Sequence, residues 1–351
     1  MRNKKVIHLI FAVLLIPLTV IFYGCGKEKK QESKSLTVVS WGGVFQDAQR
    51  EAFFKPFAEK FGVEVKEESY SGEYARIEAM VNAKDVKWDV IEVESNFLLS
   101  ATKKGLLEPM DYKVIDKSKL IETAIHPNGV ATIVWATVLA WNKDRLPKGV
   151  PPPSSWKDFW DVNKYPGLRG LRKTPRVSLE MALLVDGVTP DKLYPIDVER
   201  ALKKLDEIKP HISWWTSGAD SQQKLVSECV LTNIWNGRAW ATLQDGKPVD
   251  MTLNQGFLDY DWWVVPKGAK NKKLAMKFID FASNPEGQIA IANKFGYGPP
   301  NKTAFRLMDN KTRKYMPSDP NNLPMLIRFD AQWWAENEAW ITEKWNEWLL
   351  K

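Results

Sequence analysis

The spacing of apolar residues after residue 35 changes repeatedly from short continuous runs to helical periodicity. Short β-branched runs predict strands at 36–40, 63–65 and 89–93. Apolar residues three or four positions apart predict helices at 46–61, 74–81 and 97–104. This alternation is typical of βαβ units, so we expect an α/β protein with largely parallel sheets flanked by helices.

The second half of the chain continues in the same way with longer elements. Residues 129–142 form a long apolar run that predicts a strand, and 156–160 predict a short helix. Further helices are expected at 198–208, after Trp235-Asn236-Gly237-Arg238, at 274–283 and within 327–350, and further strands at 230–234 and 262–265. Ligands of open parallel sheets bind beyond the carboxyl ends of strands. Two such ends are Trp41-Gly42-Gly43 and Glu94-Ser95-Asn96.

The N-terminus has the pattern of an export signal. Basic residues precede an apolar run at 6–23, and Gly24-Cys25 and a polar stretch follow. We therefore expect a signal peptide at 1–24, lipid attachment at Cys25 and a tether over 25–35. An uncleaved membrane anchor and a soluble secreted protein are the alternatives.

Charge gives little support to a nucleic-acid partner. The chain of 351 residues has a formal net charge of +7, of which residues 1–35 contribute +5. The remaining +2 is too small for an electrostatic footprint for phosphate, so no nucleic acid is expected as a partner.

Motifs for catalysis are missing from the sequence. It contains no G-x-S-x-G, H-E-x-x-H or P-loop lysine motif, and only three histidines and two cysteines. After processing at Cys25, Cys229 would be the one thiol left in the body, without a flanking histidine. We expect no enzyme, no cofactor and no metal site.

Tryptophan is unusually abundant, with 17 copies. Trp41 and Trp235 each end a predicted strand and precede a turn, which favours a position in a pocket. Aromatic faces and carboxylates are the groups that hold a desolvated ammonium. Five other tryptophans are interpreted as core residues: Trp88, Trp135, Trp156, Trp160 and Trp240.

A series of short segments, in order, resembles the substrate-binding lipoproteins of bacterial ABC importers, and most closely the spermidine/putrescine-binding group. The segments are VVSWGG (38–43), QREAFFKPF (49–57), DVIEVES (89–95), VLAWN (138–142), PSSWKDFWD (153–161), LTNIWNGR (231–238), DYDWWVVPKGAKN (259–271) and YGPPNKTAF (297–305). The resemblance implies two α/β lobes joined by crossing strands, with the ligand between them. The first lobe would be 36–138 plus 262–305, and the second 139–261 plus 306–351.

The same resemblance implies roles for individual residues. Trp41, with Gly42 beside it, and Trp235 match ligand-stacking positions, and Asp261 matches an aspartate that pairs with an amine. The other implied cleft positions are Glu94, Asn96, Tyr297 and Trp334. Three of these residues have an alternative interpretation: a surface charge for Asp261, a salt bridge to a loop lysine for Glu94, and a packed turn residue for Tyr297.

Departures from the polyamine binders bear on the identity of the ligand. Those proteins hold the far amine with an acidic pair, which aligns here with Thr174 and Val177. Arg238 follows the WNG turn, and its planar guanidinium suits a carboxylate. With Asp261 opposite, the pair would suit an ω-amino acid such as γ-aminobutyrate. The alternative for Arg238 is a structural pair with Asp261 or Glu228.

The expected function is therefore an extracytoplasmic, lipid-anchored receptor, monomeric by resemblance, that delivers an amine or amino-acid-like solute to an ABC permease. A carbohydrate receptor or lytic enzyme, a ferric-ion binder and a cell-wall interaction protein are the alternatives. Arg169, Arg172 and Arg176 are interpreted as a solvated basic face, and Trp333, Trp340 and Trp348 as a helix face packed on the second lobe.

Overall fold

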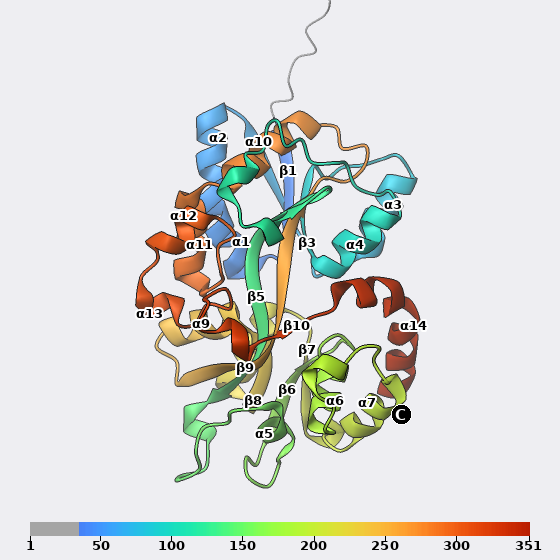
Figure 1. Cartoon of the computed structure of the whole chain (residues 1–351), viewed down its shortest axis with the longest axis vertical. Helices are drawn as coiled ribbons and strands as arrows, with labels where there is room; N and C mark the ends of the chain where they lie inside the picture. Colours follow the sequence, from blue (N-terminus) through green and yellow to red (C-terminus); the bar gives the residue numbers. More distant parts are fainter. Residues whose placement is uncertain (1–34) are drawn as a thin grey trace, which may run out of the picture. The chain divides into compact units, whose positions relative to one another are not determined.

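The computed structural model describes residues 35–351, so the predicted signal peptide, Cys25 and the tether through residue 34 lie outside the described residues. The strands follow the order β2-β1-β3-β9-β5-β8-β6-β7, with β10 paired to β9 and β4 to β5. Three parallel strands lie at either end of this order, and antiparallel β9 and β5 join them in the middle. Figure 1 shows β5 and β9 running lengthwise between the two groups of helices. The predicted α/β class with two lobes joined by crossing strands is confirmed.

The strands are β1 (Ser35–Ser40), β2 (Glu64–Ser69), β3 (Val90–Glu94), β4 (Ile125–His126), β5 (Gly129–Asn142), β6 (Leu168–Arg172), β7 (Ile212–Trp215), β8 (Cys229–Trp235), β9 (Val249–Val264) and β10 (Ile327–Arg328). The helices are α1 (Gly43–Gln49), α2 (Lys55–Phe61), α3 (Tyr74–Asn82), α4 (Ser95–Lys103), α5 (Trp156–Trp160), α6 (Ser178–Val185), α7 (Val198–Asp206), α8 (Gly218–Ser227), α9 (Asn236–Gln244), α10 (Lys272–Ala282), α11 (Pro285–Phe295), α12 (Lys302–Leu307), α13 (Asn310–Arg313) and α14 (Ala331–Leu349).

The predicted helix at 46–61 contains a wider turn at its centre. Arg50–Phe54 form a π-helical segment between α1 and α2, and Pro56 stands in the first turn of α2. Proline has no amide hydrogen to donate, so a regular α-helical ladder cannot pass through this position unchanged. Apolar Phe53, Phe54 and Phe57 still face inward.

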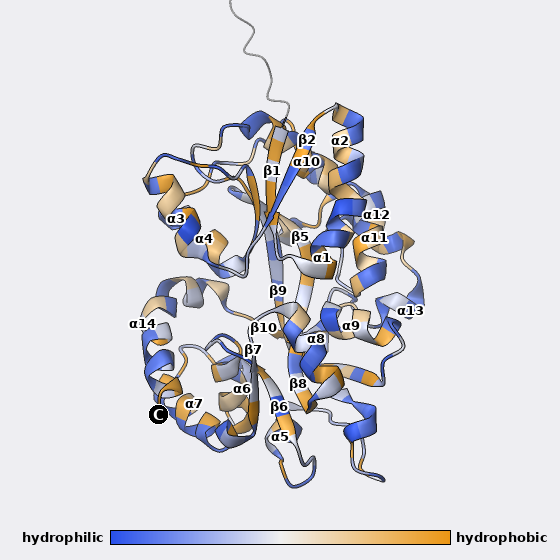
Figure 2. Cartoon of the chain, turned by 180° about the vertical axis from the view of Figure 1, so that it is seen from behind, coloured by the Kyte–Doolittle hydropathy of each residue, from blue (hydrophilic) through white to orange (hydrophobic). Residues whose placement is uncertain are grey.

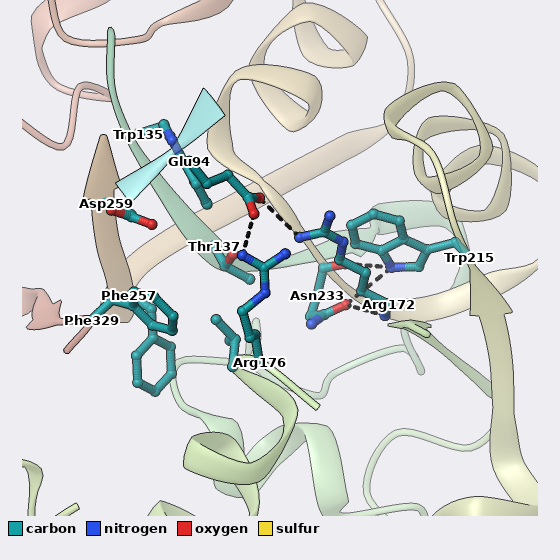
Figure 3. Close-up of a pocket in the computed structure, with 11 residues that line it drawn as sticks. Glu94, Trp135, Thr137, Arg172, Arg176, Trp215, Asn233, Phe257, Asp259 and Phe329 are labelled. Atoms are coloured by element: carbon teal, nitrogen blue, oxygen red, sulfur yellow. Dashed lines mark hydrogen bonds and ion pairs between the residues drawn. The ribbon is translucent and has the colours of Figure 1, made fainter. Parts of the chain in front are cut away.

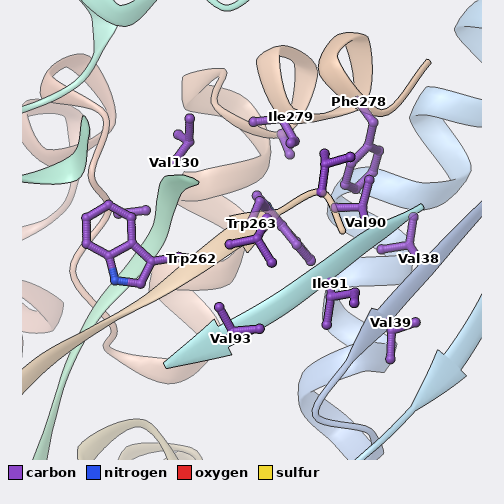
Figure 4. Close-up of a cluster of buried hydrophobic side chains, with 14 of the residues drawn as sticks. Val38, Val39, Val90, Ile91, Val93, Val130, Trp262, Trp263, Phe278 and Ile279 are labelled. Carbon is purple, nitrogen blue, oxygen red and sulfur yellow. The ribbon is translucent and has the colours of Figure 1, made fainter. Parts of the chain in front are cut away.

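Two large apolar cores define the two lobes. The first core is built around β1, β3 and the end of β9, and its side chains come from 36–135 and 262–297. Figure 4 shows the valines and isoleucines of β1 and β3 packed beside Trp263 and Phe278. Burial of such side chains contributes about 1.5–3 kcal/mol each, so the strand ends next to this core are firmly positioned.

The second core collects side chains from 139–257 and from 327–348. Helix α14 contributes Trp334, Ile341, Trp345 and Trp348, and α6 contributes a nearly continuous buried run. Figure 2 shows both hydrophilic and hydrophobic residues along α14, as expected for a helix with one covered face. Of the three tryptophans predicted to pack on the second lobe, Trp348 is buried in this core and Trp333 packs against it, but Trp340 is 45% exposed, so the prediction is wrong for Trp340.

The chain passes between the lobes mainly through β5 and β9. Strand β9 is far longer than the predicted strand at 262–265, because it begins at Val249. Its register with β5 shifts at Ala131/Ile133 and at Thr137/Leu139, which are bulges in the middle of the pair. The predicted lobe limits near 138/139, 261/262 and 305/306 stay a prediction.

Among residues 35–351, no helix is both long enough and apolar enough to cross a membrane. Cys229 is buried and carries a free thiol. Burial raises the pKa of that thiol to about 12, so it remains protonated and unreactive at neutral pH.

Candidate functional site

A pocket lies where the ends of β1, β3 and β8 meet the middle of β5 and the last part of β9. We call it the Arg238 pocket, and it is lined by Trp41, Phe45, Glu94, Ile133, Trp135, Trp235, Arg238, Asp261 and Tyr297. Its residues come from both halves of the chain, and β5 and β9 supply the residues in between. This is the position at the carboxyl ends of strands where ligands of open α/β sheets bind.

Two glycines shape the turn that carries Trp41. Gly42 and Gly43 have φ of +66° and +57°, a region that residues with a Cβ rarely adopt. A Cβ on Gly42 would also lie 3.1 Å from the Cβ of Ser69. The turn therefore brings the half-buried Trp41 ring to the pocket, where it stacks on Tyr70 with a centroid distance of 4.9 Å.

Arg238 is buried in this pocket without an acidic partner. Only 3% of the residue is exposed, and its Nε and Nη1 atoms have no hydrogen-bond partner among residues 35–351. Gly218 makes room for it, because a Cβ there would lie 2.5 Å from Nε. Burial lowers the pKa of the guanidinium, although arginine remains charged at any ordinary pH. A buried, unpaired cation is costly unless an anion joins it.

Asp261 is the matching buried carboxyl group. It is 5% exposed, and its Oδ1 accepts a hydrogen bond of 2.7 Å from Nε1 of Trp135. Burial and the nearby carboxylates of Glu92 and Glu94 raise its pKa well above the ordinary value. In strand register, Asp261 stands directly opposite Glu94. A positive group entering the pocket would relieve this concentration of acids.

Glu94 is already neutralised by two arginines. Nη1 of Arg172 lies 3.3 Å from Glu94 Oε1, and Nη1 of Arg176 contacts Oε2. Burial raises the pKa of Glu94, but the two guanidinium groups outweigh it and leave the pKa below its usual value. The interpretation of Arg172 and Arg176 as a solvated basic face is therefore wrong, as is that of Glu94 as the partner of a loop lysine.

Arg172 and Arg176 line a second pocket, which we call the Arg176 pocket. It shares Glu94 and Trp135 with the first, and Figure 3 shows both arginines directed at the Glu94 carboxylate. Asp259 lies across this pocket, and burial raises its pKa to about 7. The full lining is Glu94, Trp135, Thr137, Arg172, Arg176, Val177, Trp215, Asn233, Phe257, Asp259 and Phe329.

Five of the predicted site residues besides Glu94 also meet in the Arg238 pocket: Trp41, Trp235, Arg238, Asp261 and Tyr297. Trp235 meets Trp135 and Trp215 edge to face, with centroid distances of 6.1 and 5.4 Å. Tyr297 packs over the start of α9, where a Cβ on Gly237 would lie 2.2 Å from its ring. The WNG turn is thus compatible with this tyrosine only because its last residue has no side chain.

Three predicted site residues do not line either pocket. Gly42 donates its amide to Gln46 and acts through the Trp41 turn. Asn96 lies next to the pocket rim, where it accepts a hydrogen bond from Arg176 and donates one to Glu338. Trp334 is wholly buried in the second core and donates to Glu180, so its assignment to the cleft is wrong.

Another arginine expected on the basic face is also buried. Arg169 has no exposed surface and donates to the carbonyl oxygens of Phe159, Gly167 and Asp161. It holds the loop before β6 and belongs to neither pocket. Burial lowers its pKa to about 10, which still leaves it charged at neutral pH.

Sequence reasoning missed Trp135, Phe45 and Ile133. Trp135 was assigned to the core, and it is buried, yet it lines both pockets and positions Asp261. The signal that could have found it is the period of two along β5, which places Ile133 and Trp135 on one face. Phe45 follows the glycine turn by two residues and presents its ring at 5.9 Å from the Arg238 guanidinium.

The structure has a two-lobed α/β fold with a buried, charged pocket at the strand ends beside the crossing strands, which is an arrangement suited to holding a small solute. The sequence profile of the bacterial extracellular solute-binding protein family matches residues 52–320, and the chain belongs to that family. The resemblance to the substrate-binding proteins of ABC importers is thereby confirmed.

Individual relatives cover most of the chain. The γ-aminobutyric acid-binding protein of Pseudomonas aeruginosa is 39% identical over 327 residues, which is 91% of this chain and 92% of that protein. The spermidine/putrescine-binding periplasmic protein of Escherichia coli is 28% identical over 72% of this chain and 74% of its own length. The solved structure of the Atu4243 γ-aminobutyric acid receptor is 40% identical, covers 90% of this chain and 97% of its own, and superposes with a TM-score of 0.81.

Proposed function

We propose that this protein is the extracytoplasmic receptor of an ABC importer and that its ligand is a short ω-amino acid, with γ-aminobutyrate as the best candidate. The single observation that carries the proposal is that a buried guanidinium group and a buried carboxyl group line one pocket without an ionic partner. Within residues 35–351, Arg238 has no anionic partner and Asp261 has no cationic one, and both line the Arg238 pocket. A zwitterion would satisfy both groups at once.

The ligand would lie with its carboxylate at Arg238 and its ammonium at Asp261. Trp41 and Trp235 would form the aromatic walls, since ammonium groups are attracted to the faces of such rings. Excluding water strengthens both charge contacts. The names of two relatives, which are 39% and 40% identical, support the same ligand class.

The two arginines of the Arg176 pocket argue against a diamine as the ligand. A second ammonium group extending past Glu94 would approach Arg172 and Arg176, and Glu94 is already paired with both. The acidic pair expected of polyamine binders is absent at Thr174 and Val177. Like charges in a buried site cost several kcal/mol, on the order of a thousandfold in affinity.

The proposal also includes where the protein is located and how it delivers its ligand to the permease. Cys25 would carry the lipid anchor, residues 25–35 would be the tether, and a closed receptor would dock as a monomer on its permease. We expect closing to follow from the origin of the ligand contacts: Trp41 packs on the first core and Arg238 belongs to the predicted second lobe, so a ligand favours the arrangement in which both reach it.

Thermal unfolding against a panel of solutes tests the ligand class. A ligand that binds the folded state alone raises the melting temperature by mass action. We expect a rise with γ-aminobutyrate, and little or none with putrescine, spermidine or maltodextrins. A response to diamines alone would contradict the roles of Arg238 and Asp261, and a response to sugars alone would make the protein a carbohydrate receptor.

A further inference from the structure

A network of charged and amide side chains beside the pocket joins the two lobes. Arg176 lies in the loop before α6, on the second core, and is 10% exposed in its side chain. Its Nη1 contacts the carboxylate of Glu94 at the end of β3, on the first core, and donates to Oδ1 of Asn96 at 2.8 Å. One guanidinium therefore holds two residues of the opposite lobe.

Glu338 of α14 contacts two members of this network, Arg176 and Asn96. Its Oε1 lies 3.3 Å from Nε of Arg176, and its Oε2 accepts a hydrogen bond of 2.7 Å from Nδ2 of Asn96. Glu338 lines neither pocket, and its side chain is 34% exposed. We call Glu94, Asn96, Arg176 and Glu338 the interlobe network.

The position of Glu338 in the interlobe network depends on the packing of α14. Trp334, Ile341, Trp345 and Trp348 anchor α14 in the second core. Figures 1 and 2 both show the first turns of α14 next to α4, a first-lobe helix whose buried residues belong to the first core. The two helices are also joined by the exposed ion pair of Lys103 and Glu336, at 3.5 Å.

Separating the lobes would break every contact of the network that crosses between them. Glu94 would lose both arginines while remaining next to Asp261, and Asn96 would lose Arg176 and Glu338 together. Removing partners from buried charges is strongly unfavourable, because the desolvated groups are left without compensation. The closed arrangement is therefore stabilised by protein contacts as well as by ligand.

We infer that Glu338 is a positioning residue for lobe closure: through Arg176 and Asn96 it stabilises the closed receptor and slows release of a ligand that it never touches. The inference rests on the proposed function for its ligand, although the network itself is a property of the chain alone. Because these contacts must break before a bound ligand can leave, the effect belongs to the dissociation rate.

The test compares Glu338→Gln and Glu338→Lys in the full chain with Glu343→Gln and Glu343→Lys, which change an exposed residue of the same helix. The probe is γ-aminobutyrate, measured by stopped-flow binding. We expect the dissociation rate to rise about three- to tenfold in Glu338→Gln, as for a half-exposed ion pair, and further in Glu338→Lys. Association rates should stay within about twofold, since encounter precedes closure.

A second measurement needs no ligand. Hydrogen exchange of the ligand-free chain should be faster in both Glu338 variants at the Arg176 loop and at the start of α4, and unchanged in the Glu343 variants. If the wild-type protein fails to bind γ-aminobutyrate, the proposed ligand is wrong. Hydrogen exchange of the Glu338 variants then tests by itself whether the interlobe network holds the lobes together. Unchanged exchange and unchanged dissociation in Glu338→Lys would overturn the inference, as would a uniform loss of protection throughout the chain.

Discussion

Arg238 and Asp261 line one buried pocket, yet neither forms an ion pair with a residue between 35 and 351. Arg238 is brought there by the start of α9 and Asp261 by the last part of β9, three positions before its end at Val264. Folding thus positions a buried guanidinium group and a buried carboxyl group in one pocket without pairing them with each other. Such an arrangement costs stability and is retained where a ligand supplies the missing counter-charges.

Replacing Arg238 should lower the affinity for ligand without lowering the stability of the folded protein. In Arg238→Gln, the carboxylate of γ-aminobutyrate would lose its buried charged partner, so we expect affinity to fall by at least about a hundredfold. The ligand-free variant should melt at or above the wild-type temperature, because a buried unpaired cation has been removed. Titration calorimetry and thermal unfolding of the same samples measure both effects. Unchanged affinity would show that Arg238 has a structural role only.

The raised pKa of Asp261 predicts that ligand binding releases protons. Burial and neighbouring acids favour the protonated carboxyl group, whereas an ammonium ligand requires the ionised form. Affinity for γ-aminobutyrate should therefore weaken as the pH falls below the raised pKa. Calorimetry in buffers of different ionisation enthalpy counts the released protons, and no release at any pH from mildly acidic to neutral would contradict this assignment.

The same group makes the ligand-free protein less stable as the pH rises. Between the ordinary aspartate pKa of about 3.9 and the raised folded value, the unfolded chain has lost the proton that the folded chain keeps. Stability therefore declines with increasing pH through this window, and Asp261→Asn should remove part of the decline while abolishing binding. Chemical unfolding at several pH values checks the sign.

Much of the fold could be predicted from local pattern. The strand at 129–142 and the helix at 156–160 agree residue by residue with β5 and α5, because both are uninterrupted apolar or aromatic segments. Strand β9 was underestimated, since Asp259 and Asp261 look like residues of a solvated segment although both are buried. A buried carboxyl group in mid-strand contradicts the usual association of charge with surface.

The site could be predicted only where strand ends mark it. Trp41, Glu94 and Trp235 each stand at such an end. The pairing of Glu94 with Arg176 joins residues 82 positions apart, and nothing in the local sequence indicates it. Trp334 was misplaced for a related reason: which face of α14 is covered depends on the second core, not on the helix itself.

Aromatic walls should matter for affinity independently of the charges. We expect Trp235→Ala to weaken binding of γ-aminobutyrate by about ten- to a hundredfold, through the lost ring face and the entry of water. Trp340→Ala is the control, since Trp340 is 45% exposed on α14 and lines neither pocket. Because the chain has 17 tryptophans, their combined fluorescence would obscure the signal of one, so affinity should be measured by calorimetry. Equal losses in the two variants would argue against a role for Trp235 in the pocket.

A buried glutamate in the second core predicts a pH effect on stability without an effect on binding. Glu180 is fully buried, and it accepts hydrogen bonds from Nε1 of Trp334 at 2.6 Å and from the hydroxyl of Tyr194 at 2.8 Å. Burial raises its pKa to about 7 in spite of these two donors.

The folded chain therefore keeps the Glu180 proton while the unfolded chain releases it near pH 4.3, and stability falls as the pH rises from about 4 to about 7. Glu180→Gln keeps an acceptor for Trp334 and cannot ionise, so its free energy of unfolding at pH 8 should exceed that of wild type by about 1–3 kcal/mol. At pH 4 the two proteins should be close to equal. Urea unfolding at both pH values, with Glu343→Gln as control, measures the difference. A variant that is less stable than wild type at pH 8 would mean that Glu180 is stabilised as an anion by the second core.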